Sequence, residues 1–256
     1  MTLGRRTIQS DANALRPYLG SKVGDAFAMF QALPQLRGFW PMSSIDDGFD
    51  AFDLSAQGRT LTATSLTAAS FTTKNIMPYC VYDGSADFHS RADESGLDIT
   101  GSLTMGCWYS PTTTPSGSSE YILTKNGAVT QFAYQLRRVQ TTGYIKVEIS
   151  ADGTATTAAA TNTSTIPVAG VWSWVVFRFD SASTLSVTVN TDKASVATAA
   201  TTIFNSTASF AIGCTDPDGG GTNLMPGSVS MAFLCAAALS DSHIAELYNS
   251  TKGLFK

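Results

Sequence analysis

One run of eight residues decides the fold class: Trp172-Ser173-Trp174-Val175-Val176-Phe177-Arg178-Phe179. Large apolar residues alternate with other residues along it, which is the two-residue period of a β-strand with one buried face. Tyr144-Ile145-Lys146-Val147-Glu148-Ile149 alternates in the same way. Both runs are short, as strands are, so the chain around them is predicted to be β-structure.

Similar short runs recur from Gly38 to the C-terminal region. They predict strands at 38–42, 80–82, 103–109, 121–124, 132–137, 144–149, 172–179, 185–189, 209–212 and 228–235. Dipeptides that favour tight turns separate them, among them Asp83-Gly84, Asn126-Gly127 and Asp152-Gly153. Ten or more strands with no helices between them predict an all-β fold, a two-sheet sandwich that occupies residues 37–256 as one domain.

The two ends of the chain have helical patterns. Val23, Phe27, Phe30 and Leu33 fall on one face of a helix that ends before Pro34, and a shorter helical turn is expected over 10–19. Residues 1–36 are therefore predicted to form an N-terminal helical extension. Its apolar face either packs on the sandwich or serves as an arm for docking or oligomerisation. A short C-terminal helix is expected over 239–248, capped by Ser240.

Composition limits the classes of function. Charged residues make up 14% of the chain and hydrophobic ones 43%, which is too apolar for intrinsic disorder. Serine and threonine account for 62 of the 256 residues, and the net charge is −4 with a pI of about 5.1. A basic nucleic-acid-binding face is therefore not expected. No run approaches the roughly 20 apolar residues of a membrane span.

The cysteines and the N-terminal residues predict the compartment. Cys80, Cys107, Cys214 and Cys235 are widely spaced and lie in apolar surroundings, so we expect reduced, buried thiols. The first ten residues show no apolar run after Arg5 and Arg6, and hence no recognisable secretion signal. The sequence predicts a protein made and folded in a reducing cytoplasm.

Several segments, taken in order, resemble the laminin-G-like, concanavalin-A-like jelly-roll family. The segment from Phe52 to Leu61 is similar to its "D-x-S-G-x-G-x-x-L" motif, and Val171 to Asp180 to its "W-x-H-V-A-x-x-x-D" strand. The remaining likenesses are Gly38-Phe39-Trp40-Pro41-Met42, Tyr82-Asp83-Gly84-Ser85-Ala86-Asp87-Phe88, the strand 103–109, Leu185 to Asn190, Phe210 to Gly213 and Leu239 to Tyr248. Thr191 stands where the family's turn glycine is usual. The resemblance implies a two-sheet antiparallel jelly-roll sandwich, but this fold serves lectins, adhesion modules, hydrolases and virion proteins alike.

Enzymatic motifs are lacking, and we expect a protein that is not an enzyme. The family's hydrolases carry an "E-x-D-x-x-E" strand, and the four glutamates here are isolated: Glu94, Glu120, Glu148 and Glu246. His89 and His243 are the only histidines, and we expect both to be surface or cap residues rather than catalysts. No cofactor is expected to be required.

Two ligand hypotheses remain. Asp216 and Asp218, beside Gly219-Gly220-Gly221, form either a rim Ca²⁺ site or a plain solvated turn. Trp108, Trp172 and Trp174 either fill the layer between the sheets or offer a platform on which a sugar ring stacks.

Two classes of function follow. The segments 53–61 and 90–98 also resemble laminin-G-like proteins encoded by bacteriophages, which implies a virion structural protein: a decoration, minor capsid or tail-associated subunit. Such a protein would be located in the virion, with other virion proteins or copies of itself as partners, and would display its module to host-surface glycans. The alternative is a bacterial carbohydrate-binding lectin or adhesion module. In both, neither nucleic acid nor membrane insertion is expected.

Overall fold

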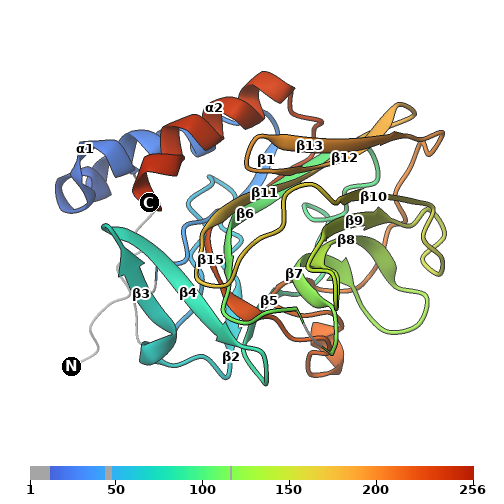
Figure 1. Cartoon of the computed structure of the whole chain (residues 1–256), viewed down its shortest axis with the longest axis horizontal. Coiled ribbons are helices and arrows are strands. Elements are labelled where there is room, and N and C mark those ends of the chain that lie inside the picture. The colour runs from blue at the N-terminus through green and yellow to red at the C-terminus, as the bar shows by residue number, and fades with distance from the viewer. Residues whose placement is uncertain (1–11, 44–47, 116) are drawn as a thin grey trace.

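The computed structural model describes residues 12–43, 48–115 and 117–256. Two antiparallel sheets lie face to face, and two helices cover the outer face of one of them (Figure 1). This arrangement confirms the predicted sandwich with a helix at each end. Neither helix of the described chain is long and apolar enough to cross a membrane.

Sheet I is the sheet that the helices cover. Its strands run in the order β13-β12-β11-β6-β15-β4-β3, and β1 also pairs with β15. Their bounds are β1 Leu36–Trp40, β3 Phe71–Lys74, β4 Met77–Asp83, β6 Leu103–Pro111, β11 Ser173–Asp180, β12 Thr184–Val189, β13 Asp192–Ala197 and β15 Pro226–Cys235. The decisive run of the sequence is thus an inner strand of this sheet.

Sheet II has the order β10-β9-β8-β7-β14-β5-β2. Its strands are β2 Thr62–Thr64, β5 Phe88–Arg91, β7 Glu120–Asn126, β8 Phe132–Arg138, β9 Ile145–Ile149, β10 Ala158–Asn162 and β14 Phe210–Ile212. Short 3-10 turns lie at η1 Ala68–Ser70, η2 Pro217–Gly219 and η3 Lys252–Leu254.

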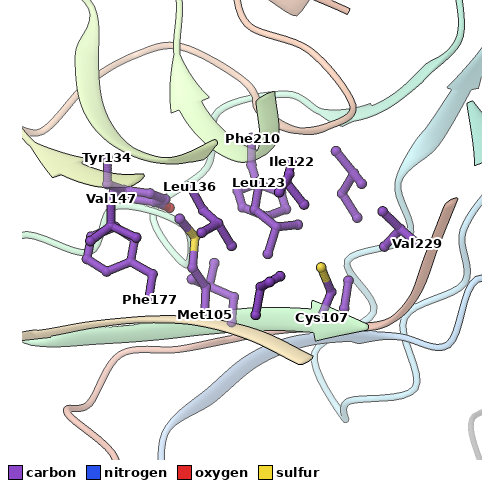
Figure 2. Packing of buried hydrophobic residues seen from close by; sticks show 14 of the residues in the cluster. Met105, Cys107, Ile122, Leu123, Tyr134, Leu136, Val147, Phe177, Phe210 and Val229 are labelled. Carbon is purple, nitrogen blue, oxygen red and sulfur yellow. The ribbon is translucent and has the colours of Figure 1, made fainter. Parts of the chain in front are cut away.

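The main core fills the space between the sheets. Alternation along β11 points Val175, Phe177 and Phe179 into it, all fully buried. Figure 2 shows side chains of the two sheets meeting there, among them Met105, Cys107, Ile122, Tyr134, Leu136, Val147 and Phe210. Trp40 belongs to this core as well, and its ring stacks on that of Phe210 at 5.2 Å.

A second apolar layer joins sheet I to the helices α1 Ala12–Gln31 and α2 Asp241–Thr251. Phe30 of α1 is fully buried and stacks on Phe39 at 4.6 Å, and it also meets Phe233 edge to face. The face formed by Val23, Phe27, Phe30 and Leu33 is therefore covered by the chain's own sheet. The expectation of a free docking or oligomerisation face there is wrong, because sheet I is itself apolar on its outer side.

The helical boundaries differ slightly from the prediction. One continuous helix replaces the two segments expected around Pro17. At the other end, Ser240 caps α2 as predicted, because its hydroxyl accepts a hydrogen bond from the backbone N–H of His243.

Candidate functional site

The tryptophans of the predicted platform lie in the layer beneath the helices rather than between the sheets. Trp172 and Trp174 are two residues apart and share the outer face of sheet I, while Val175 faces the other way. Trp174 is fully buried, and Trp108 is 3% exposed. These two rings are structural, so the prediction that they offer a stacking surface is wrong for both.

Trp172 alone of the three is partly exposed. Its ring meets that of Tyr79 edge to face at 5.1 Å, and Tyr79 on β4 is partly exposed as well. Phe255 lies against Trp172 on another side, with ring centroids 4.9 Å apart. We call the exposed pair Tyr79 and Trp172 the aromatic shelf.

Two hydroxyls lie in the sheet beside the shelf. Ser110 of β6 and Ser228 of β15 are directly paired in the sheet, and alternation places both on the outer face. Trp172 precedes Ser173, which pairs with Tyr109, so Trp172 flanks Ser110 on the next strand. Neither hydroxyl has a hydrogen-bond partner among the described residues, in contrast to Ser230, whose hydroxyl donates to the carbonyl of Pro78 at 2.7 Å.

The C-terminal segment holds the shelf in place. The ring of Phe255 stacks on Trp108 at 4.6 Å. The indole N–H of Trp108 donates to the hydroxyl of Thr251 at 2.9 Å, and that hydroxyl donates to the carbonyl of Leu247 at 2.6 Å. Trp172 therefore rests on an ordered aromatic stack, and its exposed side needs little reorganisation to receive a ligand.

The loop with Asp216 and Asp218 is built around hydrogen bonds within the chain. The carboxylate of Asp218 accepts from the backbone N–H of Ser209 at 3.0 Å and from its hydroxyl at 2.6 Å. Asp216 has a left-handed backbone, with φ of 49°, and its carbonyl accepts from Gly219 and Gly221. No group of three or more acidic, histidine or cysteine side chains able to hold a metal occurs in the described part of the chain.

Glu120 and Glu148, the two glutamates of sheet II, do not face each other as a catalytic pair of carboxylates would. Glu120 binds Arg138 at 2.8 Å and accepts from the hydroxyl of Tyr109, which belongs to the core. Glu148 follows the core residue Val147 and so faces the opposite side of sheet II. Burial alone would raise the pKa of Glu148, but hydrogen bonds from Arg137 and Lys146 outweigh it and hold the pKa below its usual value. This is the opposite of what a general acid needs.

The prediction of surface or cap residues is correct for His243 but wrong for His89. His89 is fully buried: Nε2 lies 2.9 Å from the carbonyl oxygen of Phe49, and Nδ1 lies 2.8 Å from the hydroxyl of Tyr82. His243 lies in the first turn of α2, beside its cap Ser240.

The comparisons with known proteins agree with this geometry. Residues 83–245 match the family model described as "Concanavalin A-like lectin/glucanases superfamily". The chain belongs to this superfamily. The superfamily match covers β5 to β15 and the start of α2, including most of the surroundings of the shelf; Tyr79 lies just before it. No curated protein matches the chain.

Solved structures with a similar fold include binding domains of clostridial toxins. The binding domain of Paraclostridial Mosquitocidal Protein 1 matches with a TM-score of 0.65 at 11% identity, covering 84% of this chain and 52% of that one. The ligand-binding domain of botulinum neurotoxin serotype D, in complex with N-acetylneuraminic acid, gives 0.62 at 11% identity, with 88% and 52% covered. The binding domain of botulinum neurotoxin DC with rat synaptotagmin II gives 0.63 at 10%, with 84% and 51% covered. This chain thus spans about half the length of these structures, and at such identities the likeness is one of fold.

The sequence located one residue of the shelf, Trp172, and missed Tyr79, Ser110 and Ser228. Tyr79 lies on a strand whose apolar pattern is interrupted by Pro78, and serines carry no pattern of their own. Tyr79, Ser110 and Ser228 become neighbours only through the pairing of β15 with β4 and β6, which no local sequence pattern specifies.

Proposed function

We propose that the protein is a non-catalytic carbohydrate-binding module and that the aromatic shelf is its binding surface. The observation that carries this proposal is the partly exposed pair Tyr79 and Trp172, with the unpartnered hydroxyls of Ser110 and Ser228, 6% and 7% exposed, in the sheet beside it.

The chemistry of a sugar fits this combination. One face of a pyranose ring carries mainly C–H groups, which pack on the flat surface of an indole or phenol ring. Its hydroxyls point outward and need donors and acceptors, which serine hydroxyls supply in both senses. Binding of this kind needs neither a metal nor a titrating group.

The superfamily supports the proposal only in general, since it contains both lectins and glucanases. The ligand and receptor complexes of the toxin domains concern those proteins, and they share the fold with this chain. Support for a non-catalytic role comes from the glutamates, because Glu120 and Glu148 lie on opposite faces of sheet II and each is held by an arginine.

The test is a titration of glycans against the wild-type protein and two variants. Trp172→Ala removes half of the shelf. Tyr121→Ala removes a matched ring, half-buried on the outer face of sheet II, over which the Arg137 guanidinium lies at 5.7 Å. We expect Trp172→Ala to lower affinity at least tenfold and Tyr121→Ala to leave it unchanged. Loss of binding in Tyr121→Ala alone would move the site to sheet II, and hydrolysis of the glycan by the wild-type protein would overturn the non-catalytic role.

A second candidate function is that of a structural subunit in a larger assembly such as a virion. In that case the protein would be located in the virion. One observation favours it: the loop before β11 exposes three apolar residues, Ile166 by 42%, Val168 by 60% and Val171 by 54%. Clustered apolar exposure of this kind is typical of contact surfaces between proteins. Light scattering of the wild-type protein and of Val168→Asp tests the idea. A wild-type oligomer that the variant dissociates supports it, and a wild-type monomer at all concentrations contradicts it.

A further inference from the structure

The lysines of the chain are distributed unevenly. Of the seven, three are held by carboxylates: Lys125 by Asp93 and Asp98, Lys146 by Glu148, and Lys193 by Asp241. The other four, which are Lys22, Lys74, Lys252 and Lys256, have no carboxylate within ion-pair distance in the described chain. On a protein with a net charge of −4, a group of unpaired cations is unexpected.

These four lysines gather at one corner of the molecule. A hollow between α1 and α2 is lined by Lys22, Lys252 and Lys256, together with the neutral polar side chains of Asn249 and Ser250. Asp25 is the one acidic side chain among the lining residues, against three lysine side chains. The β3–β4 turn lies near this corner in Figure 1, with the C-terminus close to it.

The contacts of that turn bring the fourth lysine to the same place. The side-chain amide of Asn75 donates to the backbone carbonyl of Lys256 at 2.6 Å. Lys74, exposed and adjacent to Asn75, is thereby tied to the C-terminal segment. Of these four lysines, only Lys252 has a side-chain partner among the described residues: its ammonium lies 2.8 Å from the amide oxygen of Asn249 and 5.4 Å above the ring of Tyr248. Neither partner neutralises its charge.

The C-terminal segment also connects this hollow with the aromatic shelf. Phe255 packs against Trp172, and the next residue, Lys256, lines the hollow. The uncharged aromatic shelf and the positively charged lysines of the hollow therefore lie next to each other on one side of the molecule. A ligand with an uncharged ring and an attached anionic group has both of its needs met there.

We propose that the hollow between α1 and α2 binds the sulfate or carboxylate groups of an acidic glycan whose neighbouring ring stacks on the aromatic shelf. This inference rests on the proposed function and specifies its ligand class. Lysine ammoniums bind such groups as point charges, without the planar geometry that arginine requires, and therefore accommodate either tetrahedral sulfate or planar carboxylate.

The experiment is calorimetric titration with five probes: heparin for sulfate, hyaluronate for carboxylate, dextran as a neutral glycan, inorganic sulfate, and vesicles containing phosphatidylserine. The variant is Lys252→Gln with Lys256→Gln. Its matched control is Lys193→Gln, which removes one positive charge at a lysine already paired with Asp241. We expect the wild-type protein to bind heparin or hyaluronate at least tenfold more tightly than dextran, with affinity falling as salt rises. The double variant should lose that advantage, and the control should keep it.

The outcomes separate this inference from the proposed function. Trp172→Ala should weaken binding of dextran and of the acidic glycans alike, whereas the lysine variant should weaken only the acidic ones. Equal affinity for dextran and heparin, unchanged in the lysine variant, overturns the inference and leaves the module a neutral-glycan binder. Lysine-dependent binding of vesicles or of inorganic sulfate without any glycan preference overturns it as well. Absence of binding to every glycan overturns both proposals.

Discussion

At the scale of single residues, Trp172 and Trp174 differ although they share one strand face. Trp174 is enclosed by Phe30, Trp108 and Phe233, whereas Trp172 keeps one side in solvent. Strand alternation predicts the shared face, but only the position of the helices decides which ring is enclosed. Trp174 is thus a buried structural residue, whereas Trp172, two positions before it, keeps a surface that a ligand can contact.

We therefore expect unequal effects of truncating these two rings. Trp174→Ala removes a fully buried aromatic side chain and should lower the free energy of unfolding by about 3–5 kcal/mol. Trp172→Ala should cost about 1–2 kcal/mol, since part of its surface is already hydrated. Urea denaturation of both variants checks this, and coincident midpoints would contradict the placement of Trp174 beneath the helices.

We expect His89 to make the free energy of unfolding depend on pH. Burial lowers the pKa of His89 to about 4, and the hydrogen bond with the Phe49 carbonyl opposes this shift without cancelling it. In the unfolded chain its pKa is about 6.5. Because the unfolded state binds a proton more readily, the full stabilisation is present above pH 6.5 and is lost progressively as the pH falls towards 4, by about 3 kcal/mol in total.

The measurement is the free energy of unfolding of the wild type and of His89→Gln at several pH values between 4 and 7. A glutamine amide can donate to Phe49 and accept from Tyr82, as the neutral imidazole does, but it does not titrate in this range. The difference between the two proteins should therefore change with pH. Parallel curves would show that His89 titrates normally in the folded protein.

Asp218 is the residue on which the calcium hypothesis can be decided. Both of its carboxylate oxygens accept hydrogen bonds from Ser209, so we expect the loop to be a plain turn held by this contact. Asp218→Ala should lower the free energy of unfolding by about 1–2 kcal/mol. Calorimetric scans of the wild type with calcium and with a chelator should superimpose. A melting temperature that rises with calcium, and no longer does so in Asp216→Asn with Asp218→Asn, would restore the metal site.

At the scale of elements, the sequence predicts the inner strands well and the outer ones poorly. Each of the ten predicted strands corresponds to an observed one, within a few residues at its ends. Five observed strands were not predicted: β2, β3, β5, β10 and β13. Four of these lie at or beside a sheet edge as short runs rich in alanine, serine, threonine or lysine, such as Ala158–Asn162 and Asp192–Ala197. Edge strands need few apolar residues, because pairing with a neighbouring strand rather than a periodic pattern holds them.

The helix α1 illustrates the same limit. The spacing of apolar residues in the sequence predicts its apolar face. Whether that face packs on a partner or on the chain's own sheet depends on the outer face of sheet I. That face is made apolar by Phe39, Trp174 and Phe233, which come from three separate strands. Sequence reasoning has no means of placing these three residues side by side.

We expect α1 to be required for a soluble fold. Phe30→Ala should lower the free energy of unfolding by about 3–5 kcal/mol, because Phe30 is fully buried against two other rings. Met29→Ala, a change in the neighbouring half-buried residue, serves as the control and should cost clearly less. Deletion of residues 1–36 should yield insoluble protein. A soluble, cooperatively unfolding deletion variant would instead show that α1 is a separable arm.

At the scale of the whole molecule, three layers are stacked: sheet II, sheet I and the helices (Figure 1). Sheet I contributes to both apolar clusters, through Cys107 and Val175 on one face and Trp108 and Trp174 on the other. Loss of the helical layer would leave large aromatic rings of the central sheet in water. The three layers should therefore unfold together as one cooperative unit.

The four cysteines can be used to measure this cooperativity, because they lie in different layers and each is labelled only when its own layer opens. Cys80 and Cys107 lie between the sheets, Cys235 lies beneath the helices, and Cys214 packs in a small cluster with Phe88. Burial raises the pKa of both Cys214 and Cys235 to about 12, and that of the two thiols between the sheets further still. Thiol reagents attack the thiolate, so the folded protein should not react with them.

We accordingly expect all four thiols to be labelled at a single rate, equal to that of global unfolding, with no change in melting temperature when a reductant is added. Mass spectrometry of partly labelled samples checks this, because it should find only unlabelled and fully labelled chains. Single-cysteine variants that retain Cys107 or Cys235 provide the decisive comparison. If Cys235 were labelled much faster than Cys107, the helical layer would open independently of the sandwich. The hollow between α1 and α2 would then be lost in that opening while the sandwich persisted.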